Sequence, residues 1–374
     1  MTSNRPTVAI LGGGQLGRML GLAAVPLGID VRFLDPKADA CAGAVGILEV
    51  GALDDAAAVA RVAKGADVVT YEWEGVPAES ARVALAHAPV RPNERALEVS
   101  QDRVAEKRAF RAAGIATADF EPVDSRRDLD AAIDRLGLPV VLKTRRGGYD
   151  GKGQAVLHST ADASPAWERL GMVACVAEAW VPFDRELSIL AVRGLGGETR
   201  AWPLVENVHE EGILRRSTAP APHSAGALQR DAEALAKALL DDLDYVGVLA
   251  IELFQVGDAL LANEMAPRVH NSGHWTIEGS VTSQFENHLR AVCELPLGAT
   301  DVVGASVMVN CLGAVPEAAR VLCISGAHLH DYGKSPAPKR KVGHVTVVAD
   351  THERAAALAD DVERIIRAAE RVSN

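Results

Sequence analysis

Two hydrophobic periods alternate over the first hundred residues of the chain. Short apolar runs of strand length recur at Thr7–Leu11, Asp30–Asp35 and Val68–Tyr71. Between them, apolar residues repeat every three or four positions, as they do on one face of a helix. A helix is expected over 54–64, and another ends near Gly28, with its apolar stripe formed by Leu16, Met19, Leu20 and Ala23. This order of strands and helices predicts a doubly wound, parallel α/β sheet.

The middle of the chain shows a second series of elements. A charged helical stretch, 96–114, leads into a helix near 127–136 and a strand at 138–143 that ends in Lys143. A glycine-rich segment, 144–154, separates this strand from another at 155–158. Further strands are predicted at 172–178, 186–193 and 199–207, the last two paired across a glycine turn and followed by a loop at 209–212.

A hairpin and a C-terminal unit complete the pattern. A long helix with Leu228, Leu235 and Leu239 on its core face precedes strands at 248–254 and 260–265, which flank the turn residues Gly257 and Asp258. Strands at 305–310 and 342–349 and a basic, proline-broken loop at 334–341 follow. The last segment, 351–372, is predicted as an amphipathic helix whose inward residues are Leu358, Val362, Ile365 and Ala369.

Composition narrows the class of protein. The 374 residues suffice for more than one domain, and the formal net charge of -11 argues against a general nucleic-acid binder. The polar start, Met1 to Pro6, does not resemble a signal peptide, and no apolar run approaches the roughly 18 residues of a membrane span. Five cysteines without a CxxC pair favour reduced thiols, so we expect a cytoplasmic protein without nucleic-acid or membrane partners.

The first glycine turn admits three interpretations. Gly12 to Gly17 fits GxGxxG, and Asp35 ends the next strand about 20 residues on, as in a dinucleotide site. This pattern makes a nicotinamide- or flavin-dependent oxidoreductase one candidate, although the motif alone is a weak signal. The turn could instead bring a helix N-terminus close to another phosphate or small ligand, or the glycines could only permit tight strand–helix packing.

The second glycine-rich segment indicates nucleotide binding more strongly. The segment is not a Walker A loop, because Gly151-Lys152 is not followed by Ser or Thr and then a helix. A glycine hairpin that folds its N–H groups over phosphates does fit, with Lys143 as a point charge on the preceding strand. The connector Glu178-Ala179-Trp180-Val181 after a later strand could present backbone groups to an adenine edge, although by itself it is only a linker.

The hairpin at 248–265 predicts a metal site. Glu252 and Glu264 stand symmetrically about its turn, so we expect them nearly opposite each other on one face. Paired carboxylates with open coordination suit Mg²⁺ bridging nucleotide phosphates, and Asn263 adds a neutral oxygen. The alternative is a surface hairpin with two solvated glutamates. Beyond it, Arg268, His270, Asn271 and His274 crowd a loop without helical or strand periodicity.

Taken together, these motifs carry a family resemblance over essentially the whole chain. GGGQLGRML, KTRRGGYDGKGQ, NEMAPRVHNSGHWT and KRKVGH are each long and specific. The chain resembles the ATP-grasp superfamily and, more narrowly, the N5-carboxyaminoimidazole ribonucleotide synthases of purine biosynthesis. The resemblance implies an α/β ATP-grasp architecture with a doubly wound preATP-grasp domain at 1–105, a small lid lobe at 106–185, a large ATP and Mg²⁺ lobe at 186–297 and a small C-terminal domain at 298–374.

The resemblance also implies site residues, position by position. The implied metal ligands are Glu252 and Glu264, and the implied catalytic residues are Arg268, Asp150 and Asn271. The ribonucleotide and bicarbonate would lie at Gln15, Tyr149, Asp150, Arg268, Arg340 and Lys341. The ATP contacts would be Arg103, Lys143, Gly148, Tyr149, Asp150, Gly151, Lys152, Gly153, Gln154, Glu178, Ala179, Trp180, Val181, Glu186, His209, Asn263 and Glu264. Lys339 departs from the family pattern, which has glycine there, and the segment Tyr71 to Glu74 is placed near substrate.

The activity implied is ATP-dependent carboxylation of 5-aminoimidazole ribonucleotide with bicarbonate, through carboxyphosphate, by a homodimeric ligase that uses Mg²⁺. One alternative is a sister ATP-grasp ligase that activates formate and acts on glycinamide ribonucleotide. The run from His270 to His274 favours the carboxylating ligase over this one. The oxidoreductase suggested by Gly12 to Asp35 is the more distant alternative.

Overall fold

A parallel sheet forms the N-terminal part of the chain in the computed structural model, which describes residues 5–148 and 153–373. Its strand order is β3-β2-β1-β4, with every neighbouring pair parallel. The predicted strands β1 (Thr7–Leu11), β2 (Asp30–Asp35) and β4 (Val68–Tyr71) have the expected bounds, and β3 (Ile47–Val50) was missed. β3 was not predicted because it is a four-residue edge strand without a fully buried residue. The helices around this sheet are α1 (Gln15–Ala24), α2 (Ala56–Ala63) and α3 (Ala78–Leu85).

The charged stretch predicted as one helix is two. α4 (Glu94–Ser100) ends before Gln101, and α5 (Arg103–Ala112) begins after Asp102. The Asp102 carboxylate accepts hydrogen bonds from the N–H groups of Val104 and Ala105, so it caps α5 and starts a new helix there.

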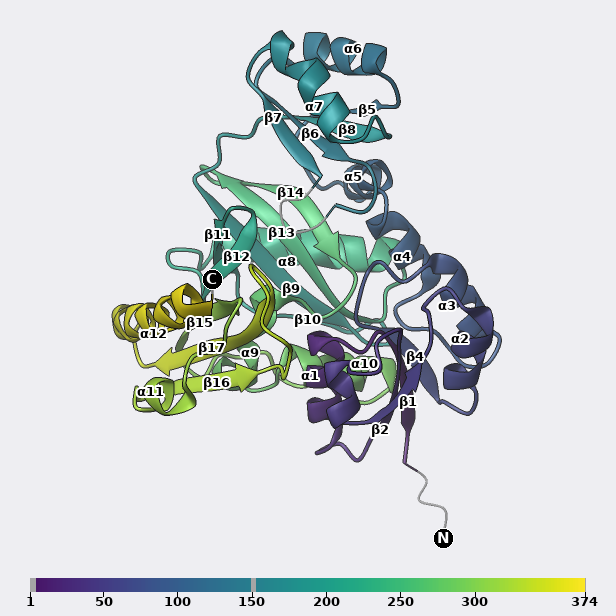
Figure 1. Ribbon diagram of the computed structural model, residues 1–374, viewed down its shortest axis with the longest axis vertical. Helices are drawn as coiled ribbons and strands as arrows, with labels where there is room; N and C mark the ends of the chain where they lie inside the picture. The colour runs from purple at the N-terminus through teal and green to yellow at the C-terminus, as the bar shows by residue number, and fades with distance from the viewer. Residues whose placement is uncertain (1–4, 149–152, 374) are drawn as a thin grey trace.

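A small lobe follows α5 and stands apart at the top of the molecule (Figure 1). Its sheet has the order β5-β8-β6-β7, formed by Phe120–Val123, Cys175–Ala179, Val140–Thr144 and Gln154–Leu157. The helices α6 (Arg126–Leu136) and α7 (Ala163–Arg169) pack on it. The predicted strand–glycine loop–strand unit is β6 and β7, which pair antiparallel with Lys143 opposite Gln154.

The large sheet continues through the rest of the chain. Its path is β14-β13-β9-β11-β12-β15-β17-β16, with β10 beside β9, so nine strands of the described residues form one sheet. The strands are β9 (Arg185–Arg193), β10 (Thr199–Ala201), β11 (Val205–Glu210), β12 (Ile213–Ala219), β13 (Gly247–Val256), β14 (Ala259–Ala266), β15 (Ala305–Leu312), β16 (Ala327–Asp331) and β17 (Lys341–Ala349). The strands of the predicted large lobe and C-terminal domain are therefore hydrogen-bonded to each other through β12 and β15.

Two predictions in this region were wrong. The strand expected over 199–207 is interrupted at Trp202 to Leu204, where Pro203 cannot donate to a strand ladder. His209 and Glu210, predicted in a loop, are the last residues of β11 and pair with β12. β16 was not predicted at all.

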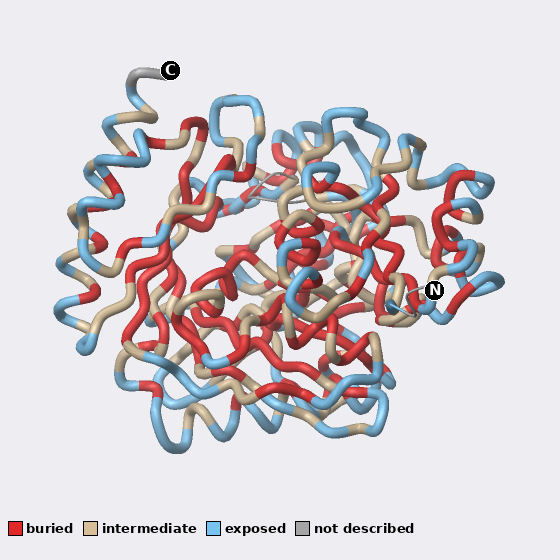
Figure 2. The backbone as a smooth tube through the Cα atoms, turned by 90° about the horizontal axis from the view of Figure 1, so that it is seen from below, coloured by how far each residue is buried: buried red, intermediate tan, exposed pale blue. Residues whose placement is uncertain are grey.

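Helices cover the large sheet and connect it to the first domain. They are α8 (Ala227–Asp242), α9 (Thr276–Gly279), α10 (Gln284–Val292), α11 (Ala318–Leu322) and α12 (His352–Ser373). Short 3₁₀ turns lie at Cys41–Ala44, Thr160–Asp162 and Asn271–Gly273. In α12, Val362 is buried as predicted, whereas Leu358 and Ile365 are only partly buried and Ile366 takes the inward position. Buried and exposed residues alternate along this helix in Figure 2.

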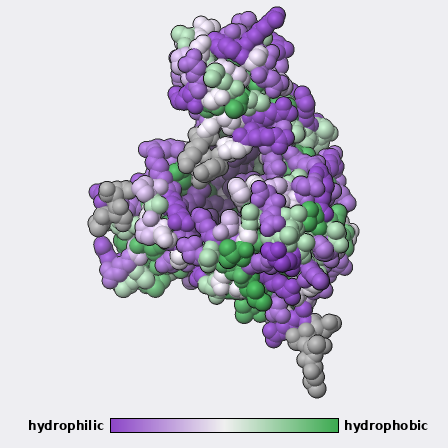
Figure 3. All heavy atoms as spheres, turned by 45° about the vertical axis from the view of Figure 1, so that its right-hand side comes forward, coloured by the Kyte–Doolittle hydropathy of each residue, from purple (hydrophilic) through white to green (hydrophobic). Residues whose placement is uncertain are grey.

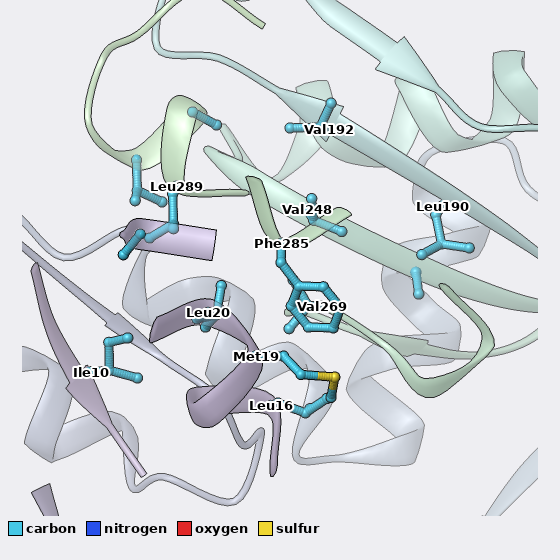
Figure 4. Close-up of a cluster of buried hydrophobic side chains, with 14 of the residues drawn as sticks. Ile10, Leu16, Met19, Leu20, Leu190, Val192, Val248, Val269, Phe285 and Leu289 are labelled. Atoms are coloured by element: carbon cyan, nitrogen blue, oxygen red, sulfur yellow. The ribbon is translucent and has the colours of Figure 1, made fainter. Parts of the chain in front are cut away.

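One apolar core joins the N-terminal domain to the large sheet. Met19 and Leu20 of α1 meet Phe285 and Leu289 of α10, and Val248 of β13 lies in the same cluster (Figure 4). The first domain is thereby packed against α10 and the strand β13 of the hairpin. Within the described part of the chain, no helix has the length and apolar character needed to cross a membrane.

Candidate functional site

The predicted glutamate pair is formed by the β13–β14 hairpin. Glu252 is the register partner of Glu264, as the sequence predicted. The register then shifts so that Leu253 pairs with Ala262, which leaves Asn263 as the extra residue of a β-bulge. A bulge re-aims side chains that would otherwise alternate between the two faces of a sheet. Glu264 and Asn263 both reach polar partners around one site as a result.

The two carboxylates differ in charge because their surroundings differ. Burial and the neighbouring charge of Glu264 raise the pKa of Glu252 to about 7. Burial acts in the same direction on Glu264, but Arg103 outweighs it and holds its pKa at about 2. Arg103 Nη1 donates to Glu264 Oε2 at 2.7 Å, and His270 Nε2 lies 3.4 Å from Glu252 Oε1. Glu252 thus holds a proton more readily than Glu264, and a cation bound between the two carboxylates would displace that proton.

Two lysines, Lys143 of β6 and Lys107 of α5, contact Asn263 of the hairpin. Lys143 Nζ of β6 donates to Asn263 Oδ1 at 3.2 Å and to Glu178 Oε2 at 3.0 Å. Glu178 is buried at the end of β8, and burial would raise its pKa, but Lys143 and then Lys107 hold it below the ordinary value. The small lobe is therefore connected to the hairpin by charged contacts.

The predicted adenine connector lies beside these lysines. The N–H groups of Ala179 and Trp180 donate to the carbonyls of Asp119 and Pro139, so those two donors are already used. An adenine edge must therefore be recognised by other groups of the connector. Across the large sheet, His209 Nδ1 and Glu186 Oε2 are 2.6 Å apart.

The segment before the predicted lid is anchored to α5. The carbonyl of Gly148 accepts a hydrogen bond from Arg103 Nη2 at 3.4 Å, and Arg145 and Arg146 both pair with the Asp102 carboxylate. Gly153 and Gln154 close the described part of the loop. The predicted site residues Tyr149, Asp150, Gly151 and Lys152 lie outside the described residues.

The predicted substrate residues lie where the first domain meets the large sheet. Arg268 forms an ion pair with Glu74 of the Tyr71 to Glu74 segment, which the sequence placed near substrate. Gln15 Oε1 accepts a hydrogen bond from Lys334 Nζ at 2.9 Å. Asn271 and Asn310 of β15 exchange side-chain amide hydrogen bonds of 3.2 and 2.8 Å.

The basic loop contributes its last residues to this side of the site. Arg340 lies in the loop and donates to the carbonyl of Ser335, and Lys341 begins β17. Lys339 has φ 61°, a left-handed conformation that glycine adopts without strain. The glycine that the family resemblance implies here is thus the residue this backbone favours, and Lys339 adopts the left-handed conformation in its place.

The first glycine turn is occupied by side chains of the protein itself. The buried Glu72 carboxylate accepts hydrogen bonds from the N–H groups of Gly14 and Gly17, the latter at 2.5 Å. Asp35, which would hold a ribose hydroxyl in a dinucleotide site, accepts from Gly13 N at 2.9 Å. The N–H groups that would bind a pyrophosphate therefore already donate to side chains of the protein. This argues against dinucleotide binding at the turn.

A hollow lies between the small lobe and the body of the molecule (Figure 3). Hydrophilic residues gather around it on the face shown, consistent with polar ligands. The ion pairs described above come from α5, β6, β8 and β14, which meet there.

Comparison with known proteins identifies the family. A ribonucleotide synthetase preATP-grasp domain matches residues 5–101, an ATP-grasp domain 108–285, and a phosphoribosylaminoimidazole carboxylase C-terminal domain 306–358. The N5-carboxyaminoimidazole ribonucleotide synthase of Pseudomonas aeruginosa is 50% identical over 361 residues, which cover 96% of this chain and 99% of that protein. The chain belongs to this family.

Solved structures of N5-carboxyaminoimidazole ribonucleotide synthases share its fold. The enzyme from Thermus thermophilus is 54% identical, with a TM-score of 0.93 over 96% of this chain and 98% of that one. The Aspergillus clavatus enzyme in complex with ADP and 5-aminoimidazole ribonucleotide is 33% identical, with a TM-score of 0.89 over 97% and 100% of the two chains. The family resemblance and the ATP-grasp architecture predicted from the sequence are confirmed. Together with the occupied glycine turn, these matches argue against the oxidoreductase and formate-activating alternatives.

Sequence reasoning missed several partners at this N5-carboxyaminoimidazole ribonucleotide synthase site. The missed residues are Asp102, Glu106, Lys107, Asn310 and Lys334. One of them left a signal: Lys107 stands at the apolar spacing of α5, three residues after Val104 and three before Phe110. A lysine in an apolar stripe indicates a buried charge with a partner. The other four stand in segments whose local pattern gives no such indication.

Proposed function

We propose that the residues at this site carry out the reaction of the family, carboxylation of 5-aminoimidazole ribonucleotide with bicarbonate at the expense of ATP. The products are N5-carboxyaminoimidazole ribonucleotide, ADP and phosphate, a step of purine biosynthesis. The observation that carries the proposal is the convergence of Arg103 and Lys143, from α5 and β6, on Glu264 and Asn263 of the hairpin that also holds Glu252. Charges from separate elements gather there as phosphoryl transfer requires.

ATP binds between the small lobe and the hairpin. Lys143 and Arg103 neutralise its phosphates, and the connector from Glu178 to Val181 holds the base. Glu186 and His209, hydrogen-bonded to each other across β9 and β11, complete the nucleotide site. The remaining contacts are Asn263, Glu264, Gln154 and the glycine loop that the sequence predicts, from Gly148 to Gly153.

Glu252 and Glu264 would hold Mg²⁺. The donor set fits, because two facing carboxylates repel each other and Glu252 has its pKa raised to about 7 in the protein alone. Hard oxygen ligands with open coordination positions are the set that Mg²⁺ uses with nucleotide phosphates. When bound, the ion would supply positive charge that neutralises the phosphates of ATP. Arg103 must then share or leave Glu264, to which it is bound here.

The carboxyl donor must be activated first. Bicarbonate is a poor electrophile because its leaving group would be hydroxide. Transfer of the γ-phosphoryl group of ATP to a bicarbonate oxygen gives carboxyphosphate and ADP, with phosphate as the new leaving group. The amine of the ribonucleotide then attacks carboxyphosphate, or carbon dioxide released from it, and loses a proton. Lys143 and Arg268 stabilise the anionic species while the site excludes water.

The ribonucleotide lies against the first domain and β17. Arg340 and Lys341 bind its phosphate, and Gln15 and Arg268 face its base and the bicarbonate. The sequence also assigns Tyr149 and Asp150, which lie outside the described residues, to this substrate. Arg268, Asp150 and Asn271 act on the reacting groups. Glu74 fixes the Arg268 guanidinium through their ion pair, which is mostly buried from solvent.

We further propose a cytoplasmic homodimer with the four domains at the residue bounds given above. All five cysteines lie within the described residues and are unpaired, which suits a reducing compartment. Light scattering of the purified protein would test the dimer.

An assay of ADP release tests the proposed function. Release should need ATP, Mg²⁺, bicarbonate and 5-aminoimidazole ribonucleotide together, and omission of the ribonucleotide should reduce it to background. Formate with glycinamide ribonucleotide is the matched control and should give no release above background. Equal release with that pair would overturn the proposal.

A further inference from the structure

A lysine outside the predicted ATP contacts lies at the centre of the site. Lys107 of α5 has only 1% of its side chain exposed. Its Nζ lies 3.2 Å from Glu178 Oε2 and donates to the backbone carbonyl of Asn263 at 3.3 Å. It therefore contacts the same carboxylate oxygen and the same asparagine as Lys143.

The cluster formed by Lys107, Lys143 and Glu178 contains more positive than negative charge. Lys107 and Lys143 contribute two positive charges and Glu178 one negative charge, and 4% of the Glu178 side chain is exposed. The other carboxylate oxygen, Oε1, has no hydrogen-bond partner among the described residues. Both lysines are thus directed to a single oxygen, and one of the two positive charges is in excess.

We propose that Lys107 is a positioning residue that neutralises Glu178, so that Lys143 can give its charge to the phosphates of ATP. The inference rests on the proposed function only in that Lys143 is taken to bind ATP.

Removal of Lys107 would change the role of Lys143. Lys143 and Glu178 would then form a one-to-one pair away from water, where opposite charges attract strongly. A phosphate could engage Lys143 only by leaving Glu178 as a buried, uncompensated charge, which is strongly unfavourable. With Lys107 present, Glu178 keeps a partner whichever way Lys143 points. The other charged groups at this end of α5 have direct partners elsewhere. Arg103 donates to Glu264, and the Glu106 carboxylate accepts a hydrogen bond from Met265 N. At longer range, Arg103 adds positive charge near Glu178 and Glu106 acts on Lys107.

The test is the charge-removing variant Lys107→Met, with Lys107→Gln as a second variant that retains a hydrogen-bond donor if the first does not fold. We expect the KM for ATP, and the Kd for ATP measured by calorimetry without the other substrates, to rise at least about 10-fold. The KM for ribonucleotide should stay within about twofold of wild type. Arg108→Met, at the next and exposed position of α5, is the matched control and should leave all three constants unchanged.

The double variant Lys107→Met/Glu178→Gln distinguishes positioning from mere support of the fold. It is compared with Glu178→Gln alone, because Glu178 is itself a predicted ATP contact. Lys143 no longer faces a carboxylate in that background, so adding Lys107→Met to Glu178→Gln should change the ATP Kd by less than about twofold. An ATP Kd within twofold of wild type in the Lys107 single variants, or an equal rise in Kd when Lys107→Met is added to Glu178→Gln, would overturn the inference. Wild-type ADP release that does not depend on the ribonucleotide would instead refute the proposed function, while the ATP titrations would still decide the role of Lys107.

Discussion

Loss of charge at the two glutamates of the hairpin should impair catalysis in both cases but should change the stability of the protein in opposite directions. Glu252→Gln and Glu264→Gln both keep the size of the side chain and remove one of the two facing carboxylates. Both should lose most of their kcat and need more Mg²⁺, because a misplacement of about 1 Å at a reacting centre costs on the order of 100-fold in rate. Their effects on the stability of the protein without Mg²⁺ and nucleotide should differ in sign.

The magnitude for Glu252 follows from its pKa of about 7, against an ordinary 4.5. Below pH 4.5 the group is protonated in both the folded and the unfolded chain, so it costs nothing. Between pH 4.5 and 7 the group releases its proton in the unfolded chain but keeps it in the folded chain, so the free energy of unfolding falls with rising pH. The loss reaches about 3 kcal/mol above pH 7. Because 21% of the side chain is exposed, solvent screening leaves about 1–2 kcal/mol that Glu252→Gln should recover.

Glu264 contributes with the opposite sign. Its pKa of about 2 means that its charge stabilises the fold above pH 4.5 and that this stability is lost as the pH falls toward 2. The contribution would be about 3 kcal/mol, but 38% of the side chain is exposed, and screening reduces it to about 1 kcal/mol. Glu264→Gln removes the partner of Arg103 and should therefore lower stability.

The assay is thermal unfolding at pH 8 without Mg²⁺ and nucleotide. Glu252→Gln should melt above wild type and Glu264→Gln below it, by roughly a few degrees between the variants. Most of the gain from Glu252→Gln should disappear at pH 5, and Glu168→Gln, at an exposed site on α7, should have no effect. If Glu252→Gln melts no higher than Glu264→Gln at pH 8, the electrostatic reasoning is wrong. Normal turnover of either variant at low Mg²⁺ would refute the metal assignment.

Three further predictions concern other parts of the molecule. Arg340→Ala should raise the KM for ribonucleotide roughly 10-fold and leave that for ATP nearly unchanged, and an equal rise in both would contradict its role. Burial lowers the pKa of His288 to about 4, so protonation of the unfolded chain should reduce the free energy of unfolding by about 3 kcal/mol as the pH falls from 6.5 to 4. Urea unfolding of His288→Leu should therefore show a weaker pH dependence than wild type in that range. Gly12→Ala places a methyl carbon 2.5 Å from the Glu72 side chain at φ 105°, so urea unfolding should show a loss of about 2 kcal/mol or more, whereas Gly65→Ala, with φ 75° and open space, should lose only about 1 kcal/mol.

Local pattern was sufficient for much of the fold. β1, β2 and β4 were predicted with their observed bounds, because a buried strand is a short apolar run between turn residues. The Glu252–Glu264 pair was also predictable, since both strands of a hairpin are contiguous in the chain and the turn sets their register. The edge strand β3 was missed although Ile47, Leu48 and Val50 are apolar, because it is only four residues long and none of its residues is fully buried.

Contacts between distant segments could not be read in this way. Arg103 and Glu264 are 161 positions apart, and Glu72 and Gly14 are 58 apart. The GxGxxG turn therefore looked like a dinucleotide site until the fold showed a carboxylate on its amides. The bulge at Asn263 shifts one residue in β14, which the alternation of apolar and polar positions did not reveal.

The sequence by itself determined the strands, the glycine turns, the hairpin with its two carboxylates, and the family. These features depend on residues close together in the chain or on long motifs. Only the tertiary structure decided which charges meet: Arg103 with Glu264, Lys107 and Lys143 on one oxygen of Glu178, and Glu72 beneath the first glycine turn. The physical reason is that charge and pKa depend on distance and burial, and the packing of the whole chain sets both.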